Sequence, residues 1–316
     1  MVFADAWSAI MTVFCIAFLG FMLKRKGWVT DETAAVIPKF LTNIALPPYL
    51  LRNITSTFSH DELMILLSGA VVPFLSLFAC FAISAFLARL CKVREERRGV
   101  FMIAFVTSNT MNIGLPINIA LFGDGAVQHV LLYFFASICF FWTVGNYCIA
   151  HDGNGKHVKI FSLESLKKVF SPPLMGFMVS LLLVYLDLRL PEPIDKTFKY
   201  IGDMVIALAV IYLGIMLHDT RIADFRLDKD TVLVLMGRFL ISPLVIIALS
   251  WVWPIPDLMR KVFIIQASLP AMVNMAILAA YYKADAKFAT VVVSVSTLMA
   301  VVTVPLITVL LSYFPE

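Results

Sequence analysis

The chain has 316 residues, of which 61% are hydrophobic and 15% are charged, with a formal net charge of +4. An apolar majority spread along the whole length excludes a water-soluble domain, because such a domain needs a mixed surface around its core. The apolar runs are continuous rather than alternating, which excludes a β-barrel and predicts an all-α polytopic membrane protein in a lipid bilayer. The positive charge does not indicate nucleic-acid binding, because the basic residues lie between apolar segments and serve topology.

At about 20 residues per span, the chain accommodates ten transmembrane helices. In chain order we expect them at residues 7–23, 33–52, 62–90, 98–122, 126–150, 163–186, 194–217, 231–253, 258–282 and 286–314. The first segment resembles a signal peptide only in its apolar character. Lys24, Arg25 and Lys26 follow it and no basic residue precedes it, so we expect it to be retained.

The basic residues are unevenly divided between the two sides of this predicted membrane protein. Of the 25 lysines and arginines, 17 lie in the odd-numbered loops or at the span ends beside them, 6 lie in or beside the even-numbered loops, and Lys39 and Arg238 lie well inside spans. The positive-inside rule therefore predicts a multi-pass protein of the plasma (inner) membrane with both termini on the outer side.

One polar connection, residues 151–162, divides the chain into two sets of five predicted helices. A second copy of an odd-numbered unit must enter the membrane from the opposite side, so we expect a first repeat at 1–150, a cytoplasmic linker at 151–162 and an inverted repeat at 163–316. A weak internal similarity supports this division. Val100, Phe101, Ile103 and Asn112 recur 162 residues later as Val262, Phe263, Ile265 and Asn274.

The predicted fourth helix carries helix-breaking residues near its middle. Asn109, Asn112, Gly114 and Pro116 occur within eight residues, and proline removes a backbone donor while glycine weakens the same turn. We therefore expect the helix to unwind around residues 111–115. The freed backbone groups need a buried or water-filled environment, which is typical of a transport site.

The predicted ninth helix repeats this design with Ser268, Pro270 and Asn274. Each break creates a second half-helix whose positive N-terminal end points at the membrane midplane, so the two breaks together predict an anion site. The alternative is that the prolines only kink the helices, as we expect for Pro73, Pro243 and Pro305. The matching positions in both halves favour function.

These residues resemble the auxin efflux carrier family in the Asn-x-x-Asn-x-Gly-x-Pro stretch of residues 109–116 and in the second Pro-x-x-x-Asn break. The second helix, with Asn43 before Leu46-Pro47-Pro48, is similar to that family's second helix, and the short inner loop resembles prokaryotic, malonate-carrier-like members rather than the plant PIN proteins. The resemblance runs from end to end.

The resemblance implies a ten-helix fold of two inverted repeats with crossed broken helices 4 and 9, as in sodium/proton antiporters and bile-acid transporters. It implies a scaffold of helices 1, 2, 6 and 7, a transport domain of helices 3–5 and 8–10, an elevator mechanism and a homodimer. The implied substrates are small carboxylates such as malonate-like or auxin-like acids. By position, the resemblance implies that Asn112 and Pro116 belong to the first break and Pro270 and Asn274 to the second. Together with the residue patterns, the expected substrate-binding residues are Asn43, Asn109, Asn112, Gly114, Pro116, Arg238, Ser268, Pro270 and Asn274.

Arg238 lies seven residues into an apolar segment, where an unpaired cation is costly. It either compensates partial charges behind the crossing breaks and attracts a dianionic substrate, or pairs structurally and snorkels. For Asp203 we favour a structural role near the outer end of the seventh helix, and Lys39 is expected to snorkel.

No pattern in the sequence indicates an enzyme, a metal site or a cofactor. The five cysteines and five histidines lack metal-ligand or disulfide spacing. A sodium/proton antiporter would need carboxylates near the breaks, and the third to fifth helices carry acidic residues only at their ends, although sodium or a proton stays open as a co-substrate. A channel filter is not evident, and a sensor would need an appended domain, which we do not expect. The sequence therefore predicts a secondary transporter of small organic anions.

Overall fold

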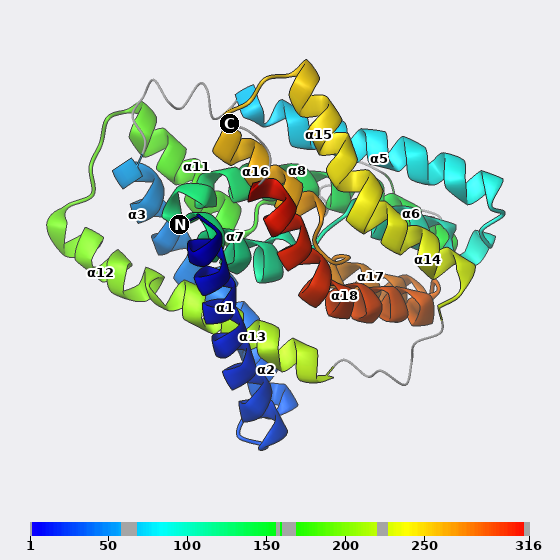
Figure 1. Ribbon diagram of the computed structural model, residues 1–316, viewed down its shortest axis with the longest axis horizontal. Coiled ribbons are helices and arrows are strands. Elements are labelled where there is room, and N and C mark those ends of the chain that lie inside the picture. The colour runs from blue at the N-terminus through cyan, green and yellow to red at the C-terminus, as the bar shows by residue number, and fades with distance from the viewer. Residues whose placement is uncertain (1, 58–67, 156–158, 160–168, 220–226, 313–316) are drawn as a thin grey trace. The chain divides into compact units, whose positions relative to one another are not determined.

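The computed structural model describes residues 2–57, 68–155, 159, 169–219 and 227–312 (Figure 1). The described chain is helical apart from one isolated antiparallel bridge. The starts of the expected third and sixth helices and part of the expected linker fall outside the described residues.

Six of the described helices are long and apolar enough to cross a membrane, which makes the protein a polytopic membrane protein. They are Asp31–Ser56, Val71–Leu90, Asp124–Asp152, Glu192–Met216, Lys229–Val252 and Ala286–Leu311. Shorter apolar helices cover Thr110–Phe122, Pro172–Tyr185 and Val273–Tyr282.

The chain forms two compact units that interleave along the sequence. Unit 1 comprises Met1–Gly69, Met111–Leu132 and Phe170–Asp219. Unit 2 comprises Ala70–Thr110, Tyr133–Val169 and Thr220–Glu316. This spatial grouping does not test the expected inverted repeats, which stay a prediction.

Unit 1 is built around the pairing of its first and last helices. Its helical segments are α1 (Val2–Arg25), α2 (Asp31–Phe40), η1 (Leu41–Ala45), α3 (Leu46–Thr57), α7 (Leu115–Phe122), η4 (Asp124–Ala126), α11 (Pro172–Tyr185), α12 (Glu192–Gly202) and α13 (Met204–Asp219). Helix α13 packs along α1 and also contacts α2, η1 and α7, while α3 packs against α11 and α12. Segment η1 is a π-helical turn, in which a wider backbone ring interrupts the second predicted helix.

The contact between α1 and α13 depends on two glycines. A Cβ atom added to Gly214 would lie 1.7 Å from the carbonyl oxygen of Ala17, and one added to Gly20 would lie 2.0 Å from the carbonyl oxygen of Ile211. The backbones therefore approach each other as closely as small residues permit, which is a common way to hold helices together in lipid.

We expect Gly214→Ala to destabilise unit 1, because the added methyl group meets backbone that cannot rotate away. Overpacking of this kind costs about 1–3 kcal/mol. The melting temperature of the detergent-solubilised protein measures it. Gly145→Ala is the control, because its nearest neighbour is a side-chain atom of Phe141 at 3.3 Å, and equal melting temperatures for the two variants would contradict the expectation.

Unit 2 contains a large hydrophobic core of buried aliphatic and aromatic side chains. Its segments are α5 (Val71–Leu90), η2 (Glu95–Arg97), α6 (Arg98–Val106), η5 (Phe141–Gly145), α9 (Asn146–Asp152), α14 (Lys229–Met236), η7 (Gly237–Ile241), α15 (Ser242–Val252), α16 (Asp257–Ala267), α17 (Val273–Tyr282) and α18 (Ala286–Ser312). Segments α14, η7 and α15 follow one another as a single rod (Figure 1). Helix α6 lies at the centre of the core, where it contacts α5, α9, α14, α17 and α18. Two further segments, η3 (Thr110–Gly114) and α8 (Val127–Phe140), pass from one unit to the other along the chain.

An arginine at the start of α6 ties three loops of unit 2 together. The Arg97 guanidinium lies 2.7 Å from Asp228, 3.3 Å from Asp230 and 2.8 Å from Asp285. It also stacks over the ring of Phe288, with its central carbon 4.6 Å from the ring centroid.

The contacts within this cluster shift the pKa values of Asp228 and Arg97. Burial raises the pKa of Asp228, but hydrogen bonds from Thr231 and Arg97 outweigh burial and hold the pKa below its ordinary value. Burial likewise lowers the pKa of Arg97, and the hydrogen bond to Asp228 and the charge of Asp285 outweigh it and raise the pKa. Arg97 and Asp228 therefore stabilise each other in their charged forms.

We expect the cluster to make the stability of the protein depend on acidity. A carboxylate whose folded pKa is depressed stabilises the fold above its unfolded pKa, near 3.9, and loses this contribution as the pH falls through the folded value. The melting temperature should therefore fall below about pH 4, and less steeply in Arg97→Gln. Arg94→Gln, which removes a positive charge three residues earlier in the chain, should keep the wild-type slope. An Arg97→Gln slope equal to that of the wild type would contradict this.

Candidate functional site

The first break lies earlier in the chain than the sequence indicates. Helix α6 ends at Val106, Thr107 is extended, and the chain becomes helical again at Thr110 as the π-helical turn η3, followed by α7. The expectation of unwinding at residues 111–115 is therefore wrong in position. The reason is that Pro116 lies in the first turn of α7, where a missing N–H leaves no hydrogen bond unmade.

The second break has the same form. Helix α16 ends at Ala267, Met272 is extended, and α17 begins at Val273. Asn274 is therefore the second residue of the half-helix that follows the break, at its positive end.

The two breaks pair with each other inside unit 2. Ser108 and Ala271 form an antiparallel bridge. The Asn109 N–H donates to the Pro270 carbonyl at 2.9 Å, and the Met272 N–H donates to the Thr107 carbonyl at 3.3 Å. Each break thus satisfies part of the backbone that the other exposes, which a membrane interior requires.

Several buried side-chain atoms at the paired breaks have no hydrogen-bond partner in the described part of the chain. They include the Asn109 amide nitrogen, the Thr110 hydroxyl and the Gln266 amide oxygen. Ser268 instead donates to the Ile264 carbonyl at 2.7 Å. Buried polar atoms that lack partners are costly, so the paired breaks hold hydrogen-bonding capacity that a bound molecule can use.

Arg238 has its whole guanidinium bonded to the ends of the half-helices that lead into the breaks. The side chain is fully buried. Its Nη1 donates to the carbonyls of Phe105 (3.2 Å) and Val106 (2.7 Å) at the end of α6. Its Nε donates to Leu269 (3.1 Å), and its Nη2 donates to Ala267 (2.8 Å) and Leu269 (3.0 Å) beyond α16.

These five bonds use all five donors of the guanidinium. They place a positive charge on the negative C-terminal ends of α6 and α16. This geometry favours compensation of partial charges over direct contact with a substrate.

Local backbone geometry brings Arg238 to these carbonyls. The residue lies in the π-helical turn η7, a form that occurs often at functional sites. A Cβ atom added to the preceding Gly237 would lie 2.2 Å from the ring of Phe105. Glycine therefore lets η7 approach α6 closely enough for the guanidinium to reach its last carbonyls.

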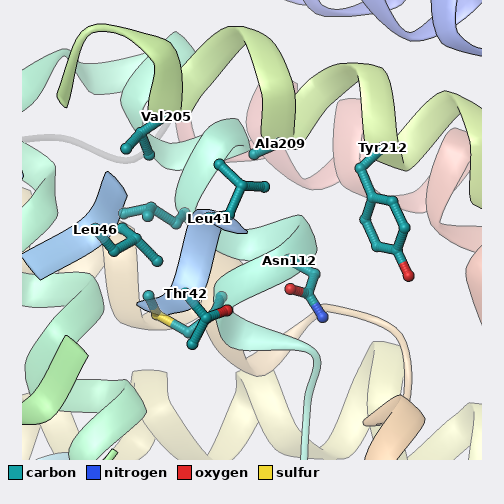
Figure 2. Close-up of a pocket in the computed structure, with 9 residues that line it drawn as sticks. Leu41, Thr42, Leu46, Asn112, Val205, Ala209 and Tyr212 are labelled. Carbon is teal, nitrogen blue, oxygen red and sulfur yellow. The ribbon is translucent and has the colours of Figure 1, made fainter. Parts of the chain in front are cut away.

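A second polar position belongs to unit 1, where a small cavity adjoins Asn112. Figure 2 shows Asn112 beside side chains from η1 and α3, which are Leu41, Thr42 and Leu46, and from α13, which are Val205, Ala209 and Tyr212. The cavity has a volume of about 10 Å³, enough for one water molecule. A carboxylic acid is larger, so binding beside Asn112 requires this lining to open.

The predicted site residues are distributed among these places. Asn109, Ser268 and Pro270 meet at the paired breaks of unit 2, with Arg238 behind them. Asn274 is exposed at the start of α17. In unit 1, Asn112 lines the cavity, Gly114 and Pro116 are buried beside it, and Asn43 is exposed.

Sequence reasoning missed three polar residues near these positions. Thr42 and Tyr212 line the cavity next to Asn112. Asn118 donates from its side chain to the Gly114 carbonyl at 2.7 Å, at the start of α7. The signal for Thr42 was its spacing of four residues from Leu46, which puts both on one face of a helix.

Broken, paired helices in a polytopic membrane protein are typical of membrane transporters. The chain belongs to the family described as membrane transport protein, whose model matches residues 5–308, and this confirms the resemblance to the auxin efflux carrier family.

The chain is similar to several transporters along almost its whole length. An uncharacterized transporter of Methanothermobacter thermautotrophicus is 25% identical over 98% of this chain and 100% of its own length. An uncharacterized transporter of Methanocaldococcus jannaschii is 22% identical over 95% and 96%. A protein of Rhizobium meliloti named "Putative malonate transporter" is 21% identical over 95% and 94%.

Proposed function

We infer that the protein is a secondary transporter of small organic anions. The observation that carries this proposal is the position of Arg238 on the carbonyls that end α6 and α16. The guanidinium neutralises the negative ends of both half-helices. The positive N-terminal ends of the half-helices that follow the breaks, η3 with α7 and α17, keep their partial charges. Asn112 in η3 and Asn274 in α17 lie at these ends, so each end attracts an anion.

The hydrogen-bonding groups at these ends suit a carboxylate. The amides of Asn112 and Asn274 can donate to a carboxylate oxygen, and the buried Asn109 amide nitrogen has no partner in the described chain. The relative named as a malonate transporter supports a small carboxylate as the substrate class. Malonate-like and auxin-like acids are therefore the first candidates.

The proposed mechanism is an elevator motion within a fold of ten helices in two inverted repeats. The grouping of α1, α2, α3, α11, α12 and α13 in unit 1 and of α5, α6 and α14 to α18 in unit 2 supports a scaffold and a moving transport domain. Helix α7, the second half of the expected fourth helix, groups with unit 1 instead. In this scheme the protein lies in the plasma membrane with both termini outside and dimerises through its scaffold.

The main alternative within the same fold is a cation/proton antiporter or an ion-coupled symporter. Proton exchange needs a buried carboxylate near the site. In the described part of the chain, the buried charged residues are Arg97 and Arg238, both cationic. This composition supports an anion carrier.

The experiment that tests the proposed function is uptake into proteoliposomes. The purified protein is reconstituted, and uptake of radiolabelled mono- and dicarboxylates is measured with and without gradients of sodium and protons. Saturable uptake of at least one carboxylate is expected. Uptake of no organic anion in this panel would overturn the proposal.

Substitution of the two asparagines by aspartate and by alanine tests the sign of the charge that the site accepts. Asn112→Asp and Asn274→Asp keep the side-chain size but add a negative charge, so we expect them to weaken carboxylate binding more than Asn112→Ala and Asn274→Ala do. The loss for alanine should be about tenfold, which corresponds to one hydrogen bond to a charged group.

Binding affinity for the transported carboxylate, measured by calorimetry, gives the comparison. Asn43→Asp makes the same change at a third expected site residue, and unchanged binding there would show that Asn43 is not a substrate ligand. If both alanine variants bind normally, the asparagines are not substrate ligands. If the aspartate variants bind more tightly than the alanine variants, the site prefers a cation.

A further inference from the structure

We propose that Arg238 is a tethered cation that occupies the place of a coupling ion, so that the carrier needs no sodium or potassium ion to form its substrate site. The claim about coupling rests on the proposed function as an anion carrier. The claim that the backbone carbonyls around Arg238 form a cation site, which Arg238 fills, does not rest on the proposed function.

The carbonyl cluster has the composition of a site for a hard cation. Four backbone oxygens, from Phe105, Val106, Ala267 and Leu269, converge on one guanidinium at distances of 2.7–3.2 Å. The Ser242 hydroxyl lies nearby, 3.5 Å from the Phe105 carbonyl. Alkali cations in membrane proteins bind to such carbonyl and hydroxyl oxygens, often at the C-terminal ends of broken helices.

Among the described residues, the guanidinium is the only charged group that balances the partial negative charges of these carbonyls. Its bonding partners are all carbonyls. The titratable groups that interact electrostatically with Arg238 are the Tyr133 phenol and the Cys80 thiol, and neither is a carboxylate. Without a cation, the carbonyl ends of two half-helices would face each other in an apolar core.

The tether has a mechanical consequence for the breaks. Because one planar group bonds to the ends of both α6 and α16, it fixes these two helix ends relative to each other. A mobile ion would do so only when bound, which is how ion binding can be coupled to substrate binding. A covalently attached cation is always present, so no ion concentration regulates the geometry.

The first test measures stability and needs no substrate. Arg238→Ala should lower the melting temperature of the detergent-solubilised protein by several degrees. Guanidinium at millimolar concentration should restore part of this loss, while tetramethylammonium, which lacks N–H donors, should not. Arg189→Ala, in an exposed loop, is the matched control and should melt like the wild type with and without guanidinium.

A lysine variant keeps the proposal testable if Arg238→Ala does not accumulate. Lysine carries the charge but has three donors instead of five, so Arg238→Lys should melt between the wild type and Arg238→Met. The proposal is overturned if Arg238→Met is as stable as the wild type, or if guanidinium stabilises Arg238→Ala no more than Arg189→Ala.

The second test measures coupling in proteoliposomes, with the carboxylate that the wild type transports. Wild-type uptake should stay the same when sodium and potassium are replaced by choline on both sides. Arg238→Ala should lose at least tenfold in uptake, and guanidinium should recover part of it. Wild-type uptake that requires sodium would overturn the claim about coupling. A wild type that transports no carboxylate would instead overturn the proposed function and leave the stability test to decide the cation site.

Discussion

The fold depends on one constraint, which is that a backbone exposed inside a membrane has no water to bond to. Both broken helices violate the regular helical pattern at Thr107–Asn109 and around Pro270, and each would be unstable alone. They become compatible with lipid because the breaks bond to each other at Ser108 and Ala271 and because Arg238 bonds to the carbonyls that lead into them. The close approach of η7 to α6 at Gly237 allows Arg238 to reach the carbonyls at the end of α6.

Much of this could be predicted from the sequence, because breaks and charges in apolar segments are conspicuous. The coincidence of proline, glycine and asparagine located both interrupted helices, and the position of Arg238 within an apolar run indicated a role behind the breaks. The family predicted from these residues is confirmed. The ten-helix repeat, the orientation and the substrate-binding residues stay predictions, which the proposed experiments test.

The details that the sequence could not predict are those that depend on tertiary contacts. The first break lies before Thr110 rather than at residues 111–115, because a proline is tolerated in the first helical turn and the pairing with Ala271 decides where the chain is extended. The π-helical turns η1, η3, η5 and η7 have no local signature. Asn43 is exposed, whereas its neighbour Thr42 lines the cavity. Which of the two side chains faces the cavity depends on the rotation of the helix at this point, and a π-helical turn changes that rotation.

The arginine behind the breaks also makes the two halves of the chain depend on each other. Arg238 belongs to the second half, yet it completes a helix end in the first half at Val106 as well as one in its own half at Ala267. Loss of Arg238 would therefore leave carbonyls without this donor at helix ends in both halves of the sequence. A chimera that takes its second half from a relative therefore needs a cation at this position for the helix end of its first half as well.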